Sequence, residues 1–150
     1  MSGHIPFRKI DIWLQGYRSI WLSTTRPDGR PHAAPVWFWW DGRSITFITG
    51  AATQKAKNLA HQNWAIFQAG DGDDVIILQG RAEIVTDAAE IERINSRYMA
   101  KYVDPFSGAQ ATVTNKGDLV YRVQIQHIMA WEYASVQTRT DWRFDESTHS

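Results

Sequence analysis

The fold is decided by residues 31–59, which read PHAAPVWFWWDGRSITFITGAATQKAKNL. Within this stretch Asp41-Gly42 separates two runs of β-branched and aromatic residues, and Asp28-Gly29 stands in the same way before the first of them. Asp-Gly between such runs predicts a hairpin with a type I′ turn, in which both central residues have positive φ. The pattern therefore predicts a three-strand antiparallel meander over residues 19–25, 32–40 and 44–49.

Helices are predicted between these and later strands. Thr53 is a suitable N-cap for a short helix that runs to His61. Asp87, with Glu90 three residues later, has the pattern of a capping box and opens the longest helix. This helix carries a predicted buried stripe and is ended by Pro105. The stripe consists of Ile91, Ile94, Tyr98 and Tyr102.

The remaining β-rich runs complete an antiparallel barrel. Gly80 lies in the middle of the longest run and predicts a bulge, and DGDD at 71–74 predicts a hairpin turn in place of a calcium loop. Further strands are predicted at 64–69, 75–85, 119–128 and about 129–133, with a short helix at 8–15. Strands joined mainly as hairpins predict one domain, residues 1–150, that is mainly β with inserted helices.

Composition excludes several classes of protein. The 150 residues carry 16 basic and 16 acidic side chains, so the basic excess of a nucleic-acid-binding protein is missing. The absence of cysteine excludes disulfides and cysteine-based metal sites, and the five histidines show no metal-ligand spacing. No run of about 18 apolar residues and no signal-peptide pattern is present, so we expect a cytoplasmic protein without membrane association.

Candidate chemistry is concentrated at residues 48–59, ITGAATQKAKNL, where a predicted strand leads into a predicted helix. A helix N-terminus presents free backbone N–H groups and the positive end of the helix dipole. Lys55 and Lys57 add positive charge there, and Thr49 and Thr53 add hydroxyl donors. The residues predict a phosphate or carboxylate pocket. The alternative that they leave open is a solvated basic face on an exposed helix.

Four segments follow one another along the chain: GRPHAAPVWFWWDG, ITFITG, TQKAKNL and VIILQGRAEIV. In this order they resemble the pyridoxamine 5'-phosphate oxidase-like split β-barrel superfamily, and the resemblance covers roughly residues 8–133. It implies a six-stranded antiparallel split β-barrel of the FMN-binding type. It also implies a homodimer with FMN in a cleft at the subunit interface.

The resemblance assigns roles to individual residues. Phosphate ligands are implied at Thr49, Thr53, Lys55 and Lys57, with Asn58 supporting the turn. Val36, Trp37 and Phe38 match the strand whose backbone runs along the isoalloxazine ring. Trp131, in the segment HIMAWEY, matches a late aromatic residue that approaches the cofactor from the partner subunit. An ordinary core tryptophan is the alternative for Trp131.

The chain departs from the true vitamin B6 oxidase at three places. It finishes DESTHS where that enzyme has an Arg-rich segment, Ile48 replaces an aromatic residue, and Trp64 replaces a common proline. These differences argue against oxidation of vitamin B6 and favour a less specialised reductase branch. The prediction is therefore an FMN-dependent oxidoreductase that passes hydride between flavin and a small hydrophobic or aromatic substrate stacked near Trp37 and Trp131.

Three alternatives stay open. An F420-dependent reductase fits the same motifs, because FMN and the deazaflavin F420 both offer a phosphate and a planar tricycle. A non-catalytic flavin- or haem-binding protein would use the same scaffold without turnover. The Trp-Phe-Trp-Trp run at 37–40 also allows an aromatic carbohydrate-binding β-module.

Overall fold

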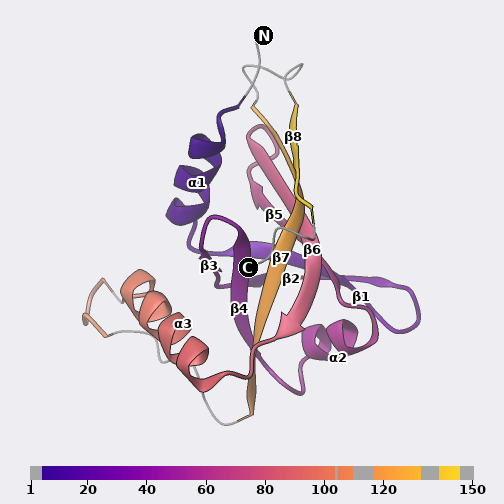
Figure 1. Ribbon diagram of the computed structural model, residues 1–150, viewed down its shortest axis with the longest axis vertical. Coiled ribbons are helices and arrows are strands. Elements are labelled where there is room, and N and C mark those ends of the chain that lie inside the picture. Colours follow the sequence, from indigo (N-terminus) through magenta and orange to yellow (C-terminus); the bar gives the residue numbers. More distant parts are fainter. Residues whose placement is uncertain (1–4, 104, 110–116, 133–138, 146–150) are drawn as a thin grey trace.

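The computed structural model describes residues 5–103, 105–109, 117–132 and 139–145 of the chain (Figure 1). Its helices are α1 (Phe7–Gly16), α2 (Gln54–His61) and α3 (Ala88–Lys101). Its strands are β1 (Ile20–Thr25), β2 (Pro31–Val36), β3 (Trp39–Trp40), β4 (Ser44–Gly50), β5 (Trp64–Gly70), β6 (Val75–Ile84), β7 (Asp118–Trp131) and β8 (Thr140–Arg143).

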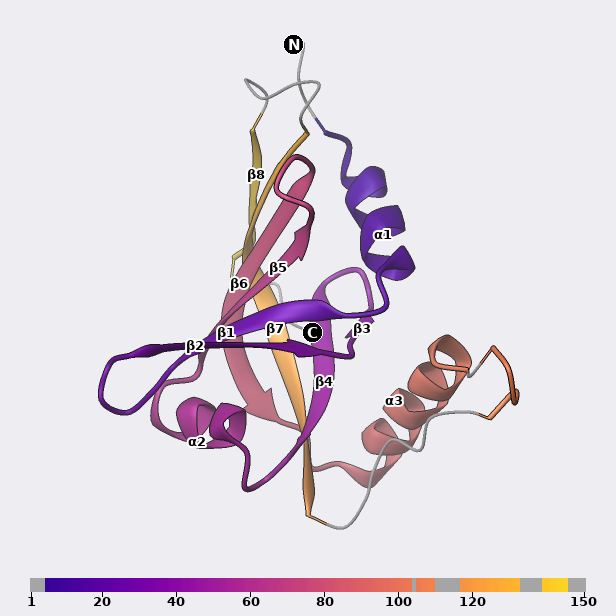
Figure 2. The same cartoon turned by 180° about the vertical axis from the view of Figure 1, so that it is seen from behind.

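The strands form one curled antiparallel sheet. Hydrogen-bonded neighbours follow the order β2-β1-β5-β6-β7-β4-β3, and β8 pairs with β7. β2 and β3 stand at opposite ends of this order, although only Trp37 and Phe38 separate them in the chain. The sheet must therefore curl until its two ends meet, and the two opposite views in Figures 1 and 2 show this curl. The predicted antiparallel, mainly β fold is confirmed, with eight strands described in place of six.

The predicted single strand over 32–40 is wrong, because the chain leaves the sheet at Trp37 and Phe38. β2 ends at Val36 and pairs with β1, whereas β3 begins at Trp39 and pairs with β4. The predicted three-strand meander is therefore wrong as well. The two hairpins that compose it exist, but they lie at the two ends of the sheet.

Side chains of α3 replace the ladder hydrogen bonds that are lost at this break. The Tyr102 hydroxyl accepts a hydrogen bond from the Phe38 N–H at 2.8 Å, and Lys101 Nζ donates to the Phe38 carbonyl at 2.9 Å. The Tyr98 hydroxyl lies 3.1 Å from the Trp37 carbonyl oxygen. Buried backbone groups must find partners, and here the partners come from a helix more than 60 positions further along the chain.

Glycine alone carries the positive φ in the two predicted Asp-Gly turns. The φ angle is +90° at Gly29 and +94° at Gly42, and among the described residues every positive φ belongs to a glycine. The predicted type I′ turn is wrong, since it needs positive φ at both central residues. Asp28 and Asp41 instead use their carboxylates to accept hydrogen bonds from the N–H groups two residues on.

The bulge predicted at Gly80 is confirmed by the pairing of β6 with β7, whose register shifts between Gln79 and Gly80. A Cβ atom at Gly80 would lie only 2.0 Å from the backbone oxygen of Gln124. The strand can therefore approach its neighbour at this point only because residue 80 has no side chain.

The end of the sheet differs from the prediction. β7 continues without a break through Met129 to Trp131, so a separate strand beginning at Met129 is wrong, and Tyr133 lies outside the described residues. β8 lies in a stretch that we predicted as a tail, and it pairs with β7. Its four residues, TDWR, are too few and too polar to show an alternating pattern.

Two separate clusters of apolar side chains hold the structure together. The larger cluster fills the barrel, and α1 contributes Ile10 and Leu14 to it. The smaller one lies under α3, which stands beside β4 on the outside of the barrel (Figure 1). Ile94, Tyr98 and Tyr102 are buried there, and Ile91 packs against them partly buried, so the predicted stripe is confirmed with one member at its edge. None of the helices in the described part of the chain is both long and apolar enough to cross a membrane.

Candidate functional site

The predicted anion site is built where β4 leads into α2. Thr53 is the N-cap, as predicted, and its Oγ1 accepts a hydrogen bond from the Ala56 N–H at 3.3 Å. Thr49 Oγ1, at the end of β4, lies 3.0 Å from Thr53 Oγ1. The structure thus brings the two hydroxyls together beside the first turn of α2, where backbone N–H groups point out of the helix.

The two lysines of this turn point to different sides of α2. Residues two positions apart on a helix are separated by about 200°, so they do not share a face. Lys57 lines a cleft between α2 and the β6–β7 end of the sheet. Lys55 lies near enough to His32 of β2 to help lower the pKa of that imidazole. A single anion between two ammonium groups is therefore not the arrangement that the helix favours.

His32 adds a third basic group to the Lys55 side. The pKa of His32 is lowered mainly by burial and to a smaller extent by the positive charges of Arg26 and Lys55. Its Nδ1 atom is buried without a hydrogen-bond partner among the described residues. The β1–β2 hairpin and α2 therefore converge on a region of positive potential, which an anion would neutralise. The sequence alone does not place His32 beside Lys55, because the approach of α2 to β2 is a tertiary contact.

The cleft on the Lys57 side has a volume of about 460 Å³. Its other lining residues are mostly apolar: Ala51, Ala56, Leu59, Ala60, Ala82, Ile84, Leu119 and Tyr121. Clefts of this size and character accept small organic molecules. If a ligand binds its anionic group at the helix N-terminus, an apolar part of the same ligand could pack against the residues of this cleft.

Asn58 is buried inside the structure and supports α2. Its side-chain amide donates to Thr24 Oγ1 of β1 at 3.0 Å and accepts from Gln54 Nε2 at 2.7 Å. The supporting role predicted for Asn58 agrees with these bonds, and a direct contact with a cofactor stays a prediction.

Of the three residues predicted to lie along the ring of a cofactor, only Trp37 presents its side chain to solvent. Val36 and Phe38 are buried in the core, whereas Trp37 is 44% exposed. The Trp37 ring stacks on Tyr102 with a centroid distance of 4.4 Å and an interplanar angle of 5°. A planar ligand at this position would therefore meet Trp37 directly and the other two residues only through the backbone.

Sequence reasoning missed the polar ends of the α3 stripe. The sequence predicts that Tyr98, Lys101 and Tyr102 belong to the long helix. It does not predict that they contact residues 37 and 38. Burial lowers the pKa of Lys101 to about 8 and raises the pKa of Tyr102 to about 12. At neutral pH the partly buried Lys101 ammonium beside Phe38 therefore carries a charge at some cost in desolvation.

Trp131 does not join the other predicted residues within one chain. It pairs with Val75 at the end of β7, whereas Leu119, near the start of that strand, pairs with Thr49. Twelve residues of extended strand span up to about 40 Å. The end of the sheet that carries Trp131 is thus the one furthest along β7 from the α2 N-terminus.

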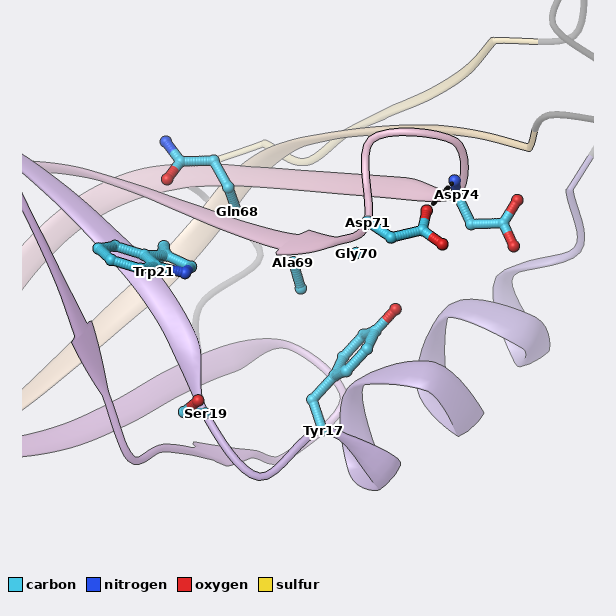
Figure 3. Close-up of a pocket in the computed structure, with 8 residues that line it drawn as sticks. All are labelled: Tyr17, Ser19, Trp21, Gln68, Ala69, Gly70, Asp71 and Asp74. Atoms are coloured by element: carbon cyan, nitrogen blue, oxygen red, sulfur yellow. Dashed lines mark hydrogen bonds between the residues drawn. The ribbon is translucent and has the colours of Figure 1, made fainter.

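A second concavity lies at that distant end, beside the β5–β6 turn (Figure 3). It has a volume of about 330 Å³ and is lined by Tyr17, Ser19, Trp21, Gln68, Ala69, Gly70, Asp71 and Asp74. Burial raises the pKa of the Tyr17 hydroxyl, and the carboxylates of Asp74 and Asp71 raise it further. The turn predicted from DGDD is confirmed, but its place in the wall of a concavity was not predicted.

The family of the chain follows from comparison of its sequence with known families. The model of the family described as pyridoxamine 5'-phosphate oxidase matches residues 8–132. The chain belongs to the pyridoxamine 5'-phosphate oxidase family. Membership supports the predicted class, an oxidoreductase of the flavin or deazaflavin type, and is compatible with both FMN and F420.

One relative of this pyridoxamine 5'-phosphate oxidase family member has a named activity. An F420H(2)-dependent biliverdin reductase of Mycobacterium tuberculosis (strain CDC 1551 / Oshkosh) is 29% identical over 110 residues, which are 72% of this chain and 75% of that protein.

Two solved structures share the fold. A conserved hypothetical protein of Mycobacterium tuberculosis superposes with a TM-score of 0.73 at 20% identity, over 97% of this chain and 96% of its own. A pyridoxamine 5'-phosphate oxidase-related, FMN-binding protein of Nostoc punctiforme has a TM-score of 0.66 at 13% identity, over 97% and 94% of the two chains. The predicted split-barrel fold of this family is thereby confirmed.

The described residues contain no group of three or more His, Cys, Asp or Glu side chains that could hold a metal ion.

Proposed function

We propose that the chain is an FMN-dependent oxidoreductase that works as a homodimer and holds the cofactor phosphate at the N-terminus of α2. The observation that carries the proposal is the convergence of Lys55, the Thr53-capped helix end and His32 on one positive region. The buried His32 Nδ1 has no hydrogen-bond partner among the described residues. These groups fit a phosphate, because helix N–H groups and a nearby ammonium bind anions in the same geometry. When bound, the cofactor supplies hydride exchange at its ring.

Of the two lysines, Lys55 is the proposed phosphate ligand. It shares its side of α2 with His32 and Arg26, whereas Lys57 opens onto a mainly apolar cleft. Thr49 and Thr53 donate or accept at the same helix end. The protein thereby fixes one end of the cofactor and leaves the ring to be placed along residues 36–38.

A homodimer is part of the proposal because one chain does not bring Trp131 near α2. The outer face of β1 and β5 carries Trp21, which is 53% exposed, and Ile66, which is 36% exposed. Such a sheet face suits the interface with a second copy, from which Trp131 could reach the cofactor. Size-exclusion chromatography with light scattering tests the dimer, and Trp21→Glu should shift it to monomer.

F420 is the second candidate cofactor, favoured by the F420H(2)-dependent relative. It shares a phosphate and a planar tricycle with FMN, so the same helix end would hold it. Titration of the purified protein with FMN, F420 and riboflavin separates the possibilities. FMN should bind at least tenfold more tightly than riboflavin, which lacks the phosphate. Equal affinities for FMN and riboflavin would remove the helix end from the proposal, and tight binding of F420 alone would replace FMN.

The proposed substrate is a small planar molecule that stacks near Trp37, with Trp131 of the partner subunit on the other side. Reduction of such a molecule by the loaded protein, measured by loss of cofactor absorbance, tests this step. A protein that binds the cofactor yet oxidises or reduces none of a panel of planar acceptors would be a carrier of flavin and not an enzyme.

A further inference from the structure

Four positively charged side chains gather over the aromatic run at residues 37–40. We call this surface the α3–tryptophan face and define it as Arg18, Trp37, Trp39, Arg93, Arg97 and Lys101. Both tryptophans lie against α3 or its C-cap: Trp37 stacks on Tyr102, and Trp39 lies beneath Arg93 and Arg97. The cations come from α3 and from the residue after the α1 cap.

Each of these cations lies against an aromatic ring. Arg18 Cζ is 5.1 Å from the centroid of Trp37, and Arg93 and Arg97 Cζ lie 5.5 and 5.9 Å from Trp39. Lys101 Nζ lies 3.6 Å from the ring of Phe38. A cation is attracted to the face of an aromatic ring, so this surface combines fixed positive charge with aromatic rings.

The face carries more positive charge than its carboxylates balance. Glu90 is bonded to both Arg93 and Arg122, which lowers its pKa to about 2. Among the ion pairs of the described residues, none involves Arg18, Arg97 or Lys101. The whole chain has zero net charge, so this excess is local. Within the described part of the chain these three cations have no carboxylate at ion-pair distance, so they would attract an anion bound here.

We propose that the α3–tryptophan face binds the substrate, and that the substrate is a planar aromatic carboxylate. Its ring would stack on the exposed surface of Trp37, whose other face is held by Tyr102. Its carboxylate would accept hydrogen bonds from Arg97 and Lys101, with Arg18 at the edge of the ring. The assignment rests on the proposed function in one respect only, that the molecule bound here reacts with the cofactor.

A nucleic acid is the competing ligand for basic and aromatic side chains. Phosphate-backbone binding needs a row of cations that releases many counterions. Four cations on a chain without net charge are too few for such a row and favour a single small anion.

Two matched probes test the charge requirement without any cofactor. The apoprotein is titrated with 2-naphthoate and with 2-naphthamide, which has the same rings without the charge, and binding is followed by ligand-detected NMR. Naphthoate should bind about tenfold or more tightly than naphthamide, the difference expected for one hydrogen bond between charged groups. Equal affinities would overturn the proposal.

Variants locate the binding. Arg97→Met and Arg97→Met with Lys101→Met should bring naphthoate down to the affinity of naphthamide. Arg81→Met is the matched control, because Arg81 lies 4.9 Å from the ring of Trp64 outside this face. An equal loss in Arg81→Met would overturn the proposal, as would displacement of naphthoate by a short single-stranded oligonucleotide. The single variant keeps the test valid if loss of the half-buried Lys101 impairs folding, which circular dichroism detects.

Affinity for naphthoate should also fall as pH rises through about 8, because the Lys101 ammonium then loses its proton. The groups that face Lys101 do not titrate there: the pKa of Tyr102 is raised to about 12 and that of Tyr98 well above 10, and Arg18 stays charged. A pH-independent affinity from pH 7 to 9.5 would exclude Lys101 from the contact.

The outcome is separable from that of the proposed function. Lys55→Met should weaken FMN binding and leave naphthoate binding unchanged. Retention of naphthoate binding in a protein that binds no flavin would leave this inference standing and remove the cofactor proposal.

Discussion

Replacement of Lys55 by methionine should weaken FMN binding by about 10- to 150-fold, while Lys57→Met should leave it within about twofold. The range is the value of one hydrogen bond to a charged group, about 1.5–3 kcal/mol, converted at 1.4 kcal/mol per factor of ten. Lys55 is only partly buried, so solvent and salt screen the charge and place the expected loss near the lower end. Methionine keeps most of the side-chain length and removes the charge.

The two lysines form a matched pair because they occupy the same turn of α2 and differ in the side to which they point. FMN affinity is measured by quenching of flavin fluorescence at low and high salt, with riboflavin as the ligand that lacks the phosphate. Lys55→Met should reduce the preference for FMN over riboflavin by about tenfold or more, and its riboflavin affinity should be unchanged.

Two results would refute this reasoning. If Lys55→Met lost FMN and riboflavin to the same extent, Lys55 would act on the ring or on the fold and not on the phosphate. If Lys57→Met lost as much FMN affinity as Lys55→Met, the opposite directions of the two side chains would have no functional meaning. Equal thermal unfolding temperatures of the two variants serve as the control for folding.

Three further predictions concern stability. Tyr102→Phe should lower the free energy of unfolding by about 1–3 kcal/mol in urea titrations, because its hydroxyl is the partner of buried backbone groups of Phe38; Tyr121→Phe, equally buried, is the control and should cost less. Gly80→Ala should cost about 1–3 kcal/mol or more, since the new Cβ meets backbone at 2.0 Å, and an unchanged melting temperature would contradict the bulge geometry. The arginines that bond Glu90 lower its pKa from 4.5 to about 2, so its stabilising contribution should be complete above about pH 4.5 and disappear toward pH 2, and Glu90→Gln should flatten that part of the acid-unfolding curve.

Features set by neighbouring residues were predictable from the sequence. The Thr53 and Asp87 caps, the bulge at Gly80 and the buried stripe of α3 depend on spacings of three or four residues or on a single glycine. The type I′ turns were wrong because the Asp residues use their carboxylates locally and keep φ negative. The sequence predicts a turn at each Asp-Gly pair, but it does not predict the φ and ψ angles of that turn.

Features set by distant residues were not predictable. The break at Trp37 and Phe38 depends on side chains of α3, which lie more than 60 positions away. The nearness of Lys55 to His32 depends on how α2 packs against β1 and β2. β8 is too short for its pattern to be recognised, and its partner β7 supplies the pairing. In each case the feature depends on a contact between distant segments, and the sequence does not show which residues of the two segments meet.

The break in the edge strand links the fold to the candidate chemistry. Without it, residues 32–40 would form one strand and the sheet could not close through β2 and β3. Tyr102 satisfies the backbone where the strand is interrupted and at the same time stacks on Trp37, so the same side chain holds the sheet ends together and positions the exposed ring. Lys101 likewise bonds the Phe38 carbonyl and carries the charge that a carboxylate would meet. A change at Tyr102 or Lys101 should therefore alter ligand selectivity and barrel closure together, whereas a change at Lys55 should alter cofactor affinity alone.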